Sequence, residues 1–260
     1  MKKMLSLSLA LLTILALSAC GTDAPSNSSV SSPADTSSVS SSAPAGSAST
    51  EPAEAPSSAP YEITYTNFTT YSDSIGTIWG QSIIEITNTG SNDLYLSTGS
   101  YDIKDENGSL VATESLVSFY PDVLQPGEKG YMYDENTFDD LSADETYTIT
   151  PHISVEDASI ACVRYDVFDT TLKNDDYNGV TLIGQLTNTT DEDGSMVHVV
   201  AVLYDEADTP LGILYTIMTN DVPAGETMGF EASGFSLPPT VSADAIANYT
   251  IYAYPLQMQF

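Results

Sequence analysis

The chain has 260 residues, of which 36 are Asp or Glu and only six are Lys or Arg, giving a formal net charge of −30 at pH 7. A surface of this sign repels phosphate groups, which argues against nucleic acid and anionic lipid headgroups as partners. Only two cysteines are present, so the fold must be held by its apolar core rather than by a framework of disulfides.

The first 19 residues predict export. Lys2 and Lys3 precede an apolar run from about Met4 to Leu17. A membrane-spanning helix needs ~20 apolar residues, so this shorter run, interrupted by serines, is typical of a secretory signal peptide over residues 1–19.

Cys20 lies at the expected cleavage point. The sequence Leu17-Ser18-Ala19-Cys20-Gly21 resembles the lipobox of bacterial lipoproteins, in which the cysteine thiol receives a diacylglycerol. The resemblance implies that Cys20 is lipidated and that the lipid anchor holds the chain on the extracytoplasmic face of the cell membrane. The acidic body and the serine-rich segment that follows favour a Gram-positive cell surface.

Residues 20–60 predict a disordered tether behind the anchor. Between residues 21 and 60 there are 14 Ser, 8 Ala and 6 Pro, and no aromatic or basic residue. Such a composition buries too little apolar surface to offset the entropy of ordering the backbone. The tether is expected to hold the rest of the chain away from the membrane.

From Tyr61 onward the sequence repeats itself at an offset of about one hundred residues. The matches are Tyr65, Phe68 and Thr70 with Tyr165, Phe168 and Thr170; Thr87–Thr89 with Thr187–Thr189; Asp105-Glu106 with Asp205-Glu206; Ser142–Asp144 with Ser242–Asp244; and, with a small slip, Pro126–Glu128 with Ala224–Glu226. Ordered matches of this kind predict two tandem domains, residues 61–158 and 159–260.

Short strands dominate both repeats. Runs rich in Val, Ile, Leu, Thr and Tyr are punctuated by Asn, Asp, Gly and Pro, and the clearest are residues 82–87, 181–187, 197–204 and 249–254. Asp105–Gly108 predicts a hairpin turn with positive φ at both Asn107 and Gly108. The pattern predicts an all-β fold of two immunoglobulin-like antiparallel β-sandwich domains after the disordered linker.

The second repeat carries a family resemblance. Leu203-Tyr204-Asp205 follows a run of β-branched residues, and Pro223-Ala224-Gly225-Glu226 follows in turn. These segments resemble the FxLYD domain, a β-sandwich module of bacterial surface lipoproteins that has no known activity. Structural roles are expected for the repeated turn residues: Asp105, Asp205, Gly127 and Gly225.

Few residues could support catalysis. His152 and His198 are the only histidines, and Cys162 and Arg164 lie two apart in a strand-like run, which resembles part of a sortase site. Because the Cys162 segment matches an ordinary strand of the repeat, with Glu62 at the equivalent position, we predict a small buried side chain there. The chain is not expected to be an enzyme.

Two kinds of ligand remain as alternatives. Carboxylate clusters such as Asp191-Glu192-Asp193 would suit calcium, although none follows the EF-hand pattern, so no cofactor is expected beyond this weak possibility. Trp79 and sixteen tyrosines would suit a glycan, with Trp79 as the first candidate contact.

The strand over residues 197–204 is apolar on both faces. Val197, Val199, Ala201 and Leu203 form one face, which we expect in the core. The opposite face is too apolar for open water, so it is either covered by the neighbouring repeat or its own loops, or it binds a partner. The hypothesis of a partner-binding face names Met196, His198, Val200, Val202 and Tyr204.

The predicted function is a non-catalytic binding or scaffolding module at the cell envelope. Its partner is expected to be an envelope protein or a basic peptide, because the negative charge favours cations. A glycan- or calcium-binding surface module is the alternative. The sequence indicates no oligomeric state.

Overall fold

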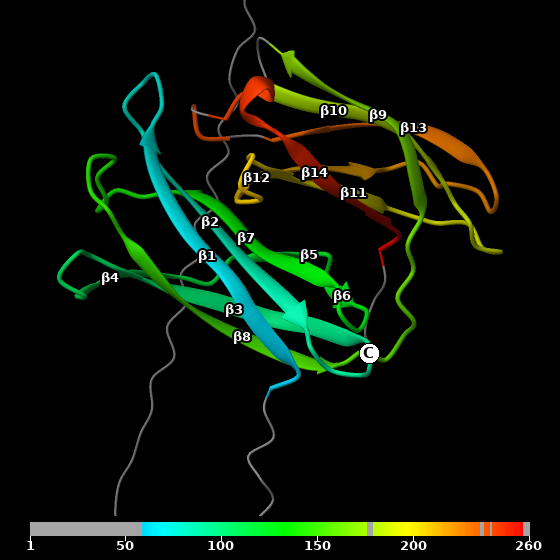
Figure 1. The fold of residues 1–260 in the computed structure, drawn as a ribbon, viewed down its shortest axis with the longest axis horizontal. Helices are drawn as coiled ribbons and strands as arrows, with labels where there is room; N and C mark the ends of the chain where they lie inside the picture. Colours follow the sequence, from blue (N-terminus) through cyan, green and yellow to red (C-terminus); the bar gives the residue numbers. More distant parts are fainter. Residues whose placement is uncertain (1–58, 176–178, 235–236, 240, 257–260) are drawn as a thin grey trace, which may run out of the picture. The chain divides into compact units, whose positions relative to one another are not determined.

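The computed structural model describes residues 59–175, 179–234, 237–239 and 241–256. The predicted signal peptide, Cys20 and nearly all of the predicted tether lie outside these residues. The described residues contain strands joined by loops and one short 3-10 turn, η1 (Ala243–Ala245), and no α-helix (Figure 1). None of them forms a helix long and apolar enough to cross a membrane.

The strands fall into two sets along the chain. The N-terminal strand set comprises β1 (Tyr61–Ser72), β2 (Ile78–Asn88), β3 (Leu94–Lys104), β4 (Leu110–Glu114), β5 (Ser118–Tyr120), β6 (Val123–Leu124), β7 (Lys129–Thr137) and β8 (Thr148–Asp157). The C-terminal strand set comprises β9 (Asp166–Asp175), β10 (Gly179–Thr187), β11 (Val197–Tyr204), β12 (Pro210–Met218), β13 (Thr227–Ser233) and β14 (Asn248–Tyr254). All pairings between these strands are antiparallel, which confirms the all-β prediction.

The same pairing order occurs in both sets. In the N-terminal set β2 lies between β1 and β7, and β3 lies between β4 and β8. In the C-terminal set β10 lies between β9 and β13, and β11 lies between β12 and β14. There a single pair, Tyr215 with Ser233, also joins β12 to β13 in one six-stranded sheet. The division into two domains at residue 159 stays a prediction.

Each strand set packs around its own apolar core. In the C-terminal set the predicted inward face of β11, Val197 to Leu203 at every second residue, packs against Val180, Leu182 and Leu186 of β10. In the N-terminal set Ile84 and Ile86 of β2 belong to a second core. This two-residue period is that of strands whose alternate side chains face a core, and it is consistent with a β-sandwich.

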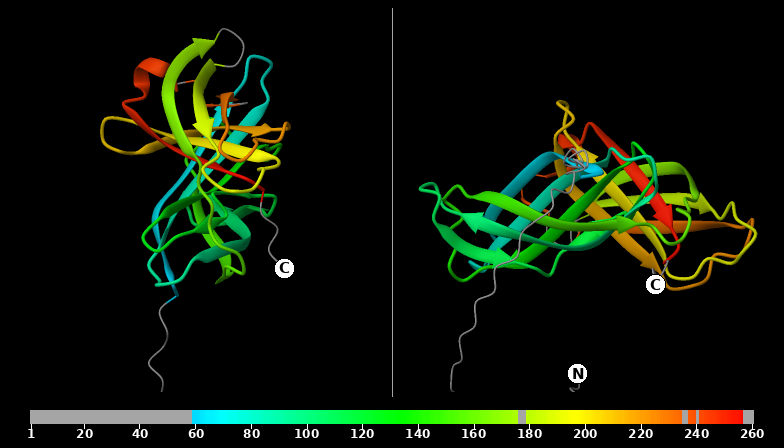
Figure 2. Two further views of the ribbon diagram at one scale, coloured as in Figure 1. Left: turned by 90° about the vertical axis from the view of Figure 1, so that its right-hand side faces the viewer. Right: turned by 90° about the horizontal axis from the view of Figure 1, so that it is seen from below.

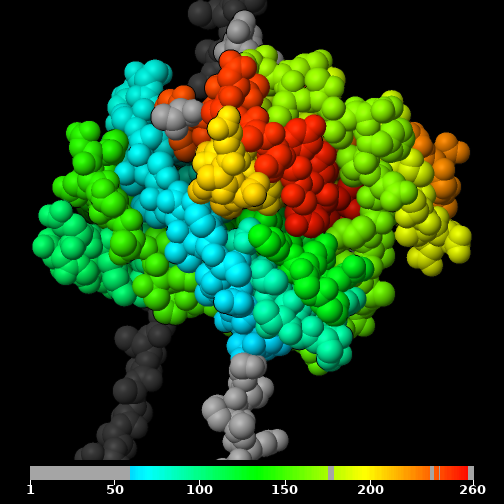
Figure 3. Space-filling model, in the orientation of Figure 1, coloured from blue at the N-terminus to red at the C-terminus, as the bar shows by residue number. Residues whose placement is uncertain are grey.

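A third apolar cluster, which we call the seam, lies between the two strand sets. It contains Ile83, Tyr131 and Tyr133 from the N-terminal set and Val200, Val202, Tyr204, Ile213 and Tyr254 from the C-terminal set. Further views show the two sets in contact (Figure 2), and in the space-filling view their atoms lie directly against one another (Figure 3). The outward faces of β2 and β7 therefore cover those of β11, β12 and β14.

The first strands of the two sets differ from the predicted alignment. Phe68 pairs with Ser82 and is 9% exposed, whereas Phe168 pairs with Gln185 and is 39% exposed. Glu85 pairs with Tyr65, and Gln185 lies at the equivalent point of β10, so Phe168 takes the place of Tyr65. The match of Phe68 with Phe168 is therefore wrong in register, because an offset of one hundred does not hold for β9.

Two aspartates organise the hairpin turns after β3 and β11. Asp105 Oδ1 accepts the backbone N–H groups of Asn107 and Ser109 at 2.9 and 2.8 Å. Asp205 Oδ1 accepts the equivalent groups of Ala207 and Thr209, both at 2.8 Å. The hydrogen bonds from the backbone N–H groups of Thr209 and Ala207 lower the pKa of Asp205, against the opposing effect of burial.

The form of the first turn differs from the prediction. Gly108 has a φ of 78°, but Asn107 is not among the residues of positive φ. The N–H of Gly108 donates to the carbonyl of Asp105, and the N–H of Asp105 donates to the carbonyl of Ser109, both at 3.0 Å. The loop is a turn followed by a single left-handed residue rather than a two-residue type I′ turn.

Two buried asparagines hold further turns. Asn88 Nδ2 donates to the carbonyls of Asn92 and Leu124, both at 2.9 Å, and Asn88 Oδ1 accepts the N–H of Gly90. The backbone carbonyl of Asn88 accepts the N–H of Gly127, which has a φ of 79°. Gly127 therefore occupies a left-handed position that favours glycine.

The C-terminal set repeats this network at Asn188. Its Nδ2 donates to the carbonyls of Glu192 and Val222 at 2.7 and 2.9 Å, and its Oδ1 accepts the N–H of Thr190. Its backbone carbonyl accepts the N–H of Gly225, which has a φ of 74°. The repeated Thr-Asn-Thr segments thus mark a structural turn rather than a ligand site.

Candidate functional site

The β11 face that was predicted to bind a partner is covered inside the chain. Val200 and Val202 have no exposed surface, and Tyr204 is 8% exposed. Their side chains pack in the seam with Ile83 and Tyr131. The prediction of a partner-binding face is wrong for these three residues, because β2 and β7 already bury this apolar surface.

Met196 and His198 do not restore a docking face. Met196 precedes β11 with a φ of 47° and is 45% exposed. The ring of His198 stacks on that of Tyr254, with centroids 5.4 Å apart. Burial lowers the pKa of His198, and the nearby carboxylate of Asp122 only partly opposes this. His198 is therefore a packed, neutral ring at pH 7.

A line of polar groups crosses the seam. The hydroxyl of Tyr204 is hydrogen-bonded to that of Tyr131, which donates to Glu85 Oε2 at 3.0 Å. Lys129 Nζ lies 2.8 Å from Glu85 Oε1. Glu85 is only 5% exposed, so these partners satisfy a charge that would otherwise be costly to bury. Tyr204 therefore has a structural role.

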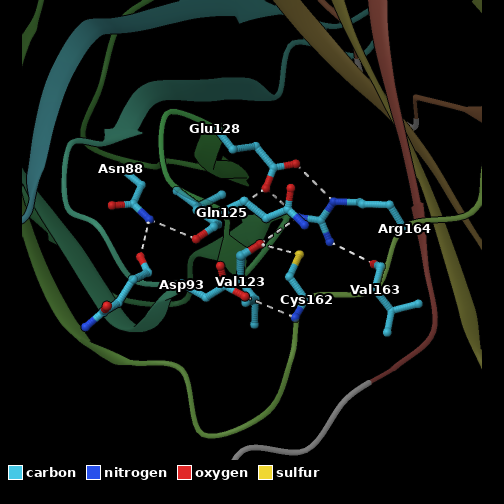
Figure 4. A network of polar contacts seen from close by, with 10 residues as sticks. Asn88, Asp93, Val123, Gln125, Glu128, Cys162, Val163 and Arg164 are labelled. Carbon is cyan, nitrogen blue, oxygen red and sulfur yellow. Dashed lines mark hydrogen bonds and ion pairs between the residues drawn. The ribbon is translucent and has the colours of Figure 1, made fainter.

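Arg164, in the connection from β8 to β9, makes a second group of polar contacts beside the seam (Figure 4). Its Nε and Nη2 donate to the two carboxylate oxygens of Glu128 at 3.0 and 2.9 Å, and Nη2 also donates to the carbonyl of Val123. Its guanidinium carbon lies 5.3 Å from the ring centroid of Tyr254 and 5.9 Å from that of Tyr252. A bidentate ion pair and two aromatic rings thus hold this arginine.

Cys162 lies in the connection from β8 to β9, so the predicted strand around it is wrong. Its N–H donates to Asp93 Oδ2 at 3.3 Å instead of to a neighbouring strand, and β9 begins only at Asp166. Burial raises the pKa of the Cys162 thiol to about 11, so the thiol is protonated and weakly nucleophilic at neutral pH.

The structure does not bring the other candidate residues together. His152 lies on an exposed face of β8, where its Nε2 is 3.2 Å from Asp102 Oδ2. In the carboxylate cluster of residues 191–193, Asp193 Oδ1 accepts the backbone N–H of Ala224. Across the described ranges, no group of three or more His, Cys, Asp and Glu side chains is placed to hold a metal ion.

Four aromatic side chains, Ser118, Glu135 and the Asp134 segment of β7 line a cavity of about 280 Å³ where the two strand sets meet. We call it the aromatic–acidic pocket. Its lining residues are Trp79 on β2, Ser118 and Tyr120 on β5, Tyr133, Asp134 and Glu135 on β7, and Tyr215 on β12. The Asp134 carboxylate itself lies on the core face of β7, where it binds the hydroxyl of Tyr101. Aromatic faces with a few fixed polar groups are typical of binding sites for small groups.

The pocket walls are held by contacts within the chain. The rings of Tyr120 and Tyr215 stack with centroids 5.8 Å apart and an interplanar angle of 23°. The hydroxyl of Tyr133 donates to Glu135 Oε2 at 2.7 Å, and Trp79 Nε1 donates to Asp73 Oδ2 at 3.2 Å. Sequence reasoning had named Trp79 alone.

Asp134, next to Glu135 on β7, is a buried acid. It is 8% exposed, and the buried hydroxyl of Tyr101 donates to its Oδ2 at 2.8 Å. Burial raises the pKa of Asp134 to about 6; the hydrogen bond from Tyr101 opposes this rise, and the nearby carboxylate of Glu114 adds to it. Asp134 therefore carries, on the core face of β7 behind the pocket, a negative charge at pH 7 that is costly to maintain.

Asp134→Asn is expected to reveal this cost as a pH-dependent change in stability. The pKa in the folded protein exceeds the ordinary value of 3.8, so stability from this group is present below about pH 4 and lost as the pH rises through about 6. The free energy of unfolding of the variant, relative to that of the unsubstituted chain, should rise by up to about 3 kcal/mol between pH 4 and pH 7. Urea unfolding at both pH values measures it, and an advantage independent of pH would contradict the account.

No family model matches the chain, and no curated protein shows significant similarity to it.

Proposed function

We propose that the chain is a membrane-anchored, extracytoplasmic lipoprotein that acts as a non-catalytic binding or scaffolding module at the cell envelope. Its partner is a protein or peptide, and the aromatic–acidic pocket is its binding site. The lipobox resemblance at Cys20 and the serine-rich tether support the anchoring. The turn opened by Asp205 directly after Tyr204, at the end of β11, is compatible with the FxLYD resemblance.

The pocket is the observation that carries this proposal. It combines four aromatic residues with the carboxylate of Glu135, and the described residues hold no paired nucleophile and base beside it. The thiol of Cys162 has a raised pKa, which makes it a weak nucleophile, and the ring of His198 stacks on the ring of Tyr254. Recognition without chemistry therefore fits these side chains better than catalysis.

The same rings favour one alternative ligand. Trp79 and the pocket tyrosines would also stack on the apolar face of a sugar ring, with Glu135 accepting its hydroxyl groups. A neutral glycan is therefore the second candidate. Calcium is the third, on the strength of the negative charge alone.

Thermal melting of the full chain in mild detergent separates these classes. A basic peptide should raise the melting temperature, because a ligand that binds only the folded state stabilises it. Tyr215→Ala, which removes one pocket wall, should abolish the shift, whereas Tyr95→Ala on β3, away from the pocket, should preserve it. A shift with cell-wall glycan or calcium alone would favour the alternatives, and no shift with any of them would contradict the proposal.

A further inference from the structure

The charge of the aromatic–acidic pocket is not balanced within the described part of the chain. The three ion pairs found there join Lys129 to Glu85, His152 to Asp102 and Arg164 to Glu128. Asp134 and Glu135 accept hydrogen bonds from tyrosine hydroxyls, which satisfy oxygen atoms without cancelling charge. A ligand that carries a positive charge would be attracted to the Glu135 carboxylate at the cavity and to the charge of Asp134 on the other face of β7.

The aromatic lining favours the same kind of ligand. Cations are attracted to the faces of Trp and Tyr rings, and a planar cation also stacks on them. The stacked rings of Tyr120 and Tyr215 come from opposite strand sets, and Trp79 and Tyr133 line the same cavity. A volume of about 280 Å³ fits a single side chain rather than a folded segment.

The chain itself contains a filled site of this chemistry. At Arg164 a guanidinium group lies beside the rings of Tyr252 and Tyr254 and binds both carboxylate oxygens of Glu128. The aromatic–acidic pocket offers tyrosine rings and the carboxylate of Glu135, and no arginine or lysine is among its lining residues. It has the composition of the Arg164 site without the cation.

We infer that the aromatic–acidic pocket binds the guanidinium or ammonium group of a basic ligand, with guanidinium preferred. This rests on the proposed function and names the chemistry of its ligand. Guanidinium is preferred because its planar fork both stacks on tyrosine and binds carboxylate oxygens through two N–H groups, whereas ammonium acts as a compact point charge. In a peptide partner the group is an arginine side chain.

The test compares two peptides that differ only in charge. Calorimetric titration of the full chain with acetyl-Gly-Gly-Arg-Gly-Gly-amide should give an affinity at least about tenfold higher than with the citrulline peptide, which keeps the shape of arginine and lacks its charge. The lysine peptide should bind with intermediate affinity. Equal affinity for the arginine and citrulline peptides would overturn the inference and leave peptide binding, the proposed function, intact.

Two variants and one small probe complete the design. Glu135→Gln should weaken binding of the arginine peptide about fivefold or more and leave the citrulline peptide unchanged, because the substitution keeps the size and removes the charge. Glu231→Gln, at an exposed position on β13, should change neither. Binding of methylguanidinium as tight as the arginine peptide would identify a free small cation as the ligand and overturn a peptide partner. Failure of both peptides and of methylguanidinium to bind would contradict inference and function together.

Discussion

Val202→Asp is expected to unfold the chain or to lower its free energy of unfolding by about 4 kcal/mol or more. Val202 has no exposed surface and lies in the seam between the two strand sets. A carboxylate placed there loses its hydration, and the seam offers it no basic partner, because Lys129 already pairs with Glu85. Urea unfolding followed by circular dichroism measures the loss.

The control for this prediction is the same substitution on an exposed strand. Val111 on β4 is 39% exposed, so Val111→Asp should change the stability by no more than about 0.5 kcal/mol. If Val202→Asp were as stable as Val111→Asp, the β11 face would be open to water. The hypothesis of a partner docking on that face would then return.

Asn188→Ala should cost about 3 kcal/mol of stability, and Asn88→Ala should cost about as much. Each substitution leaves one buried backbone carbonyl, of Leu124 or Val222, without its hydrogen bond from the asparagine side chain, together with a second carbonyl and one N–H that are partly buried. Unsatisfied buried polar groups cost about 1–3 kcal/mol each, partly relieved by relaxation of the turns. Similar losses in free energy of unfolding at Asn88 and Asn188 would show that the repeated network stabilises both strand sets to the same extent. Urea unfolding measures both losses.

Asn107→Ala provides the comparison. Asn107 lies in the exposed turn after β3, where Asp105 binds its backbone rather than its side chain. Asn107→Ala should therefore lower the free energy of unfolding by no more than about 0.5 kcal/mol. An Asn188→Ala variant as stable as Asn107→Ala would mean that the side-chain network contributes nothing to folding.

The local pattern of the chain was enough to predict the strands that form the cores. The alternation of Val197, Val199, Ala201 and Leu203 defines an inward face, and the structure places all four in the C-terminal core. The same periodicity indicated that the opposite face, with Val200 and Val202, is too apolar to face water and must be buried by another part of the molecule or by a partner. It could not identify what covers them, because Ile83 and Tyr131 belong to strands far away along the chain, and nothing in the spacing of β11 specifies them.

Similar reasons explain the errors at β9 and at Cys162. An offset of one hundred residues holds for Asn88 and Asn188, whose hydrogen bonds recur. The β9–β10 hairpin is shorter than the β1–β2 hairpin, so Phe168 lies at the position of Tyr65, three residues away from the position of Phe68. Residue identity at a fixed offset therefore did not report register there. The register of β9 is seen only in its hydrogen-bonded pairing with β10.

The aromatic–acidic pocket was beyond sequence reasoning for a different reason. Trp79 could be named because a lone tryptophan is conspicuous, but Tyr120, Asp134 and Tyr215 are ordinary strand residues in a tyrosine-rich chain. They become a site only where β2, β5, β7 and β12 meet. The signal that was present in the sequence, alternation of Tyr131 and Tyr133 on one strand, indicates a shared face and not a cavity.

The central claim is that a basic ligand binds at the aromatic–acidic pocket, and the fluorescence of Trp79 tests it most directly. Trp79 is the single tryptophan of the chain and lines the pocket, so its emission reports on this site. Titration with the arginine peptide should change the emission saturably, with the same affinity that calorimetry gives, and the citrulline peptide should not do so over the same range. Binding seen by calorimetry with no change in Trp79 emission would place the ligand elsewhere and contradict the account.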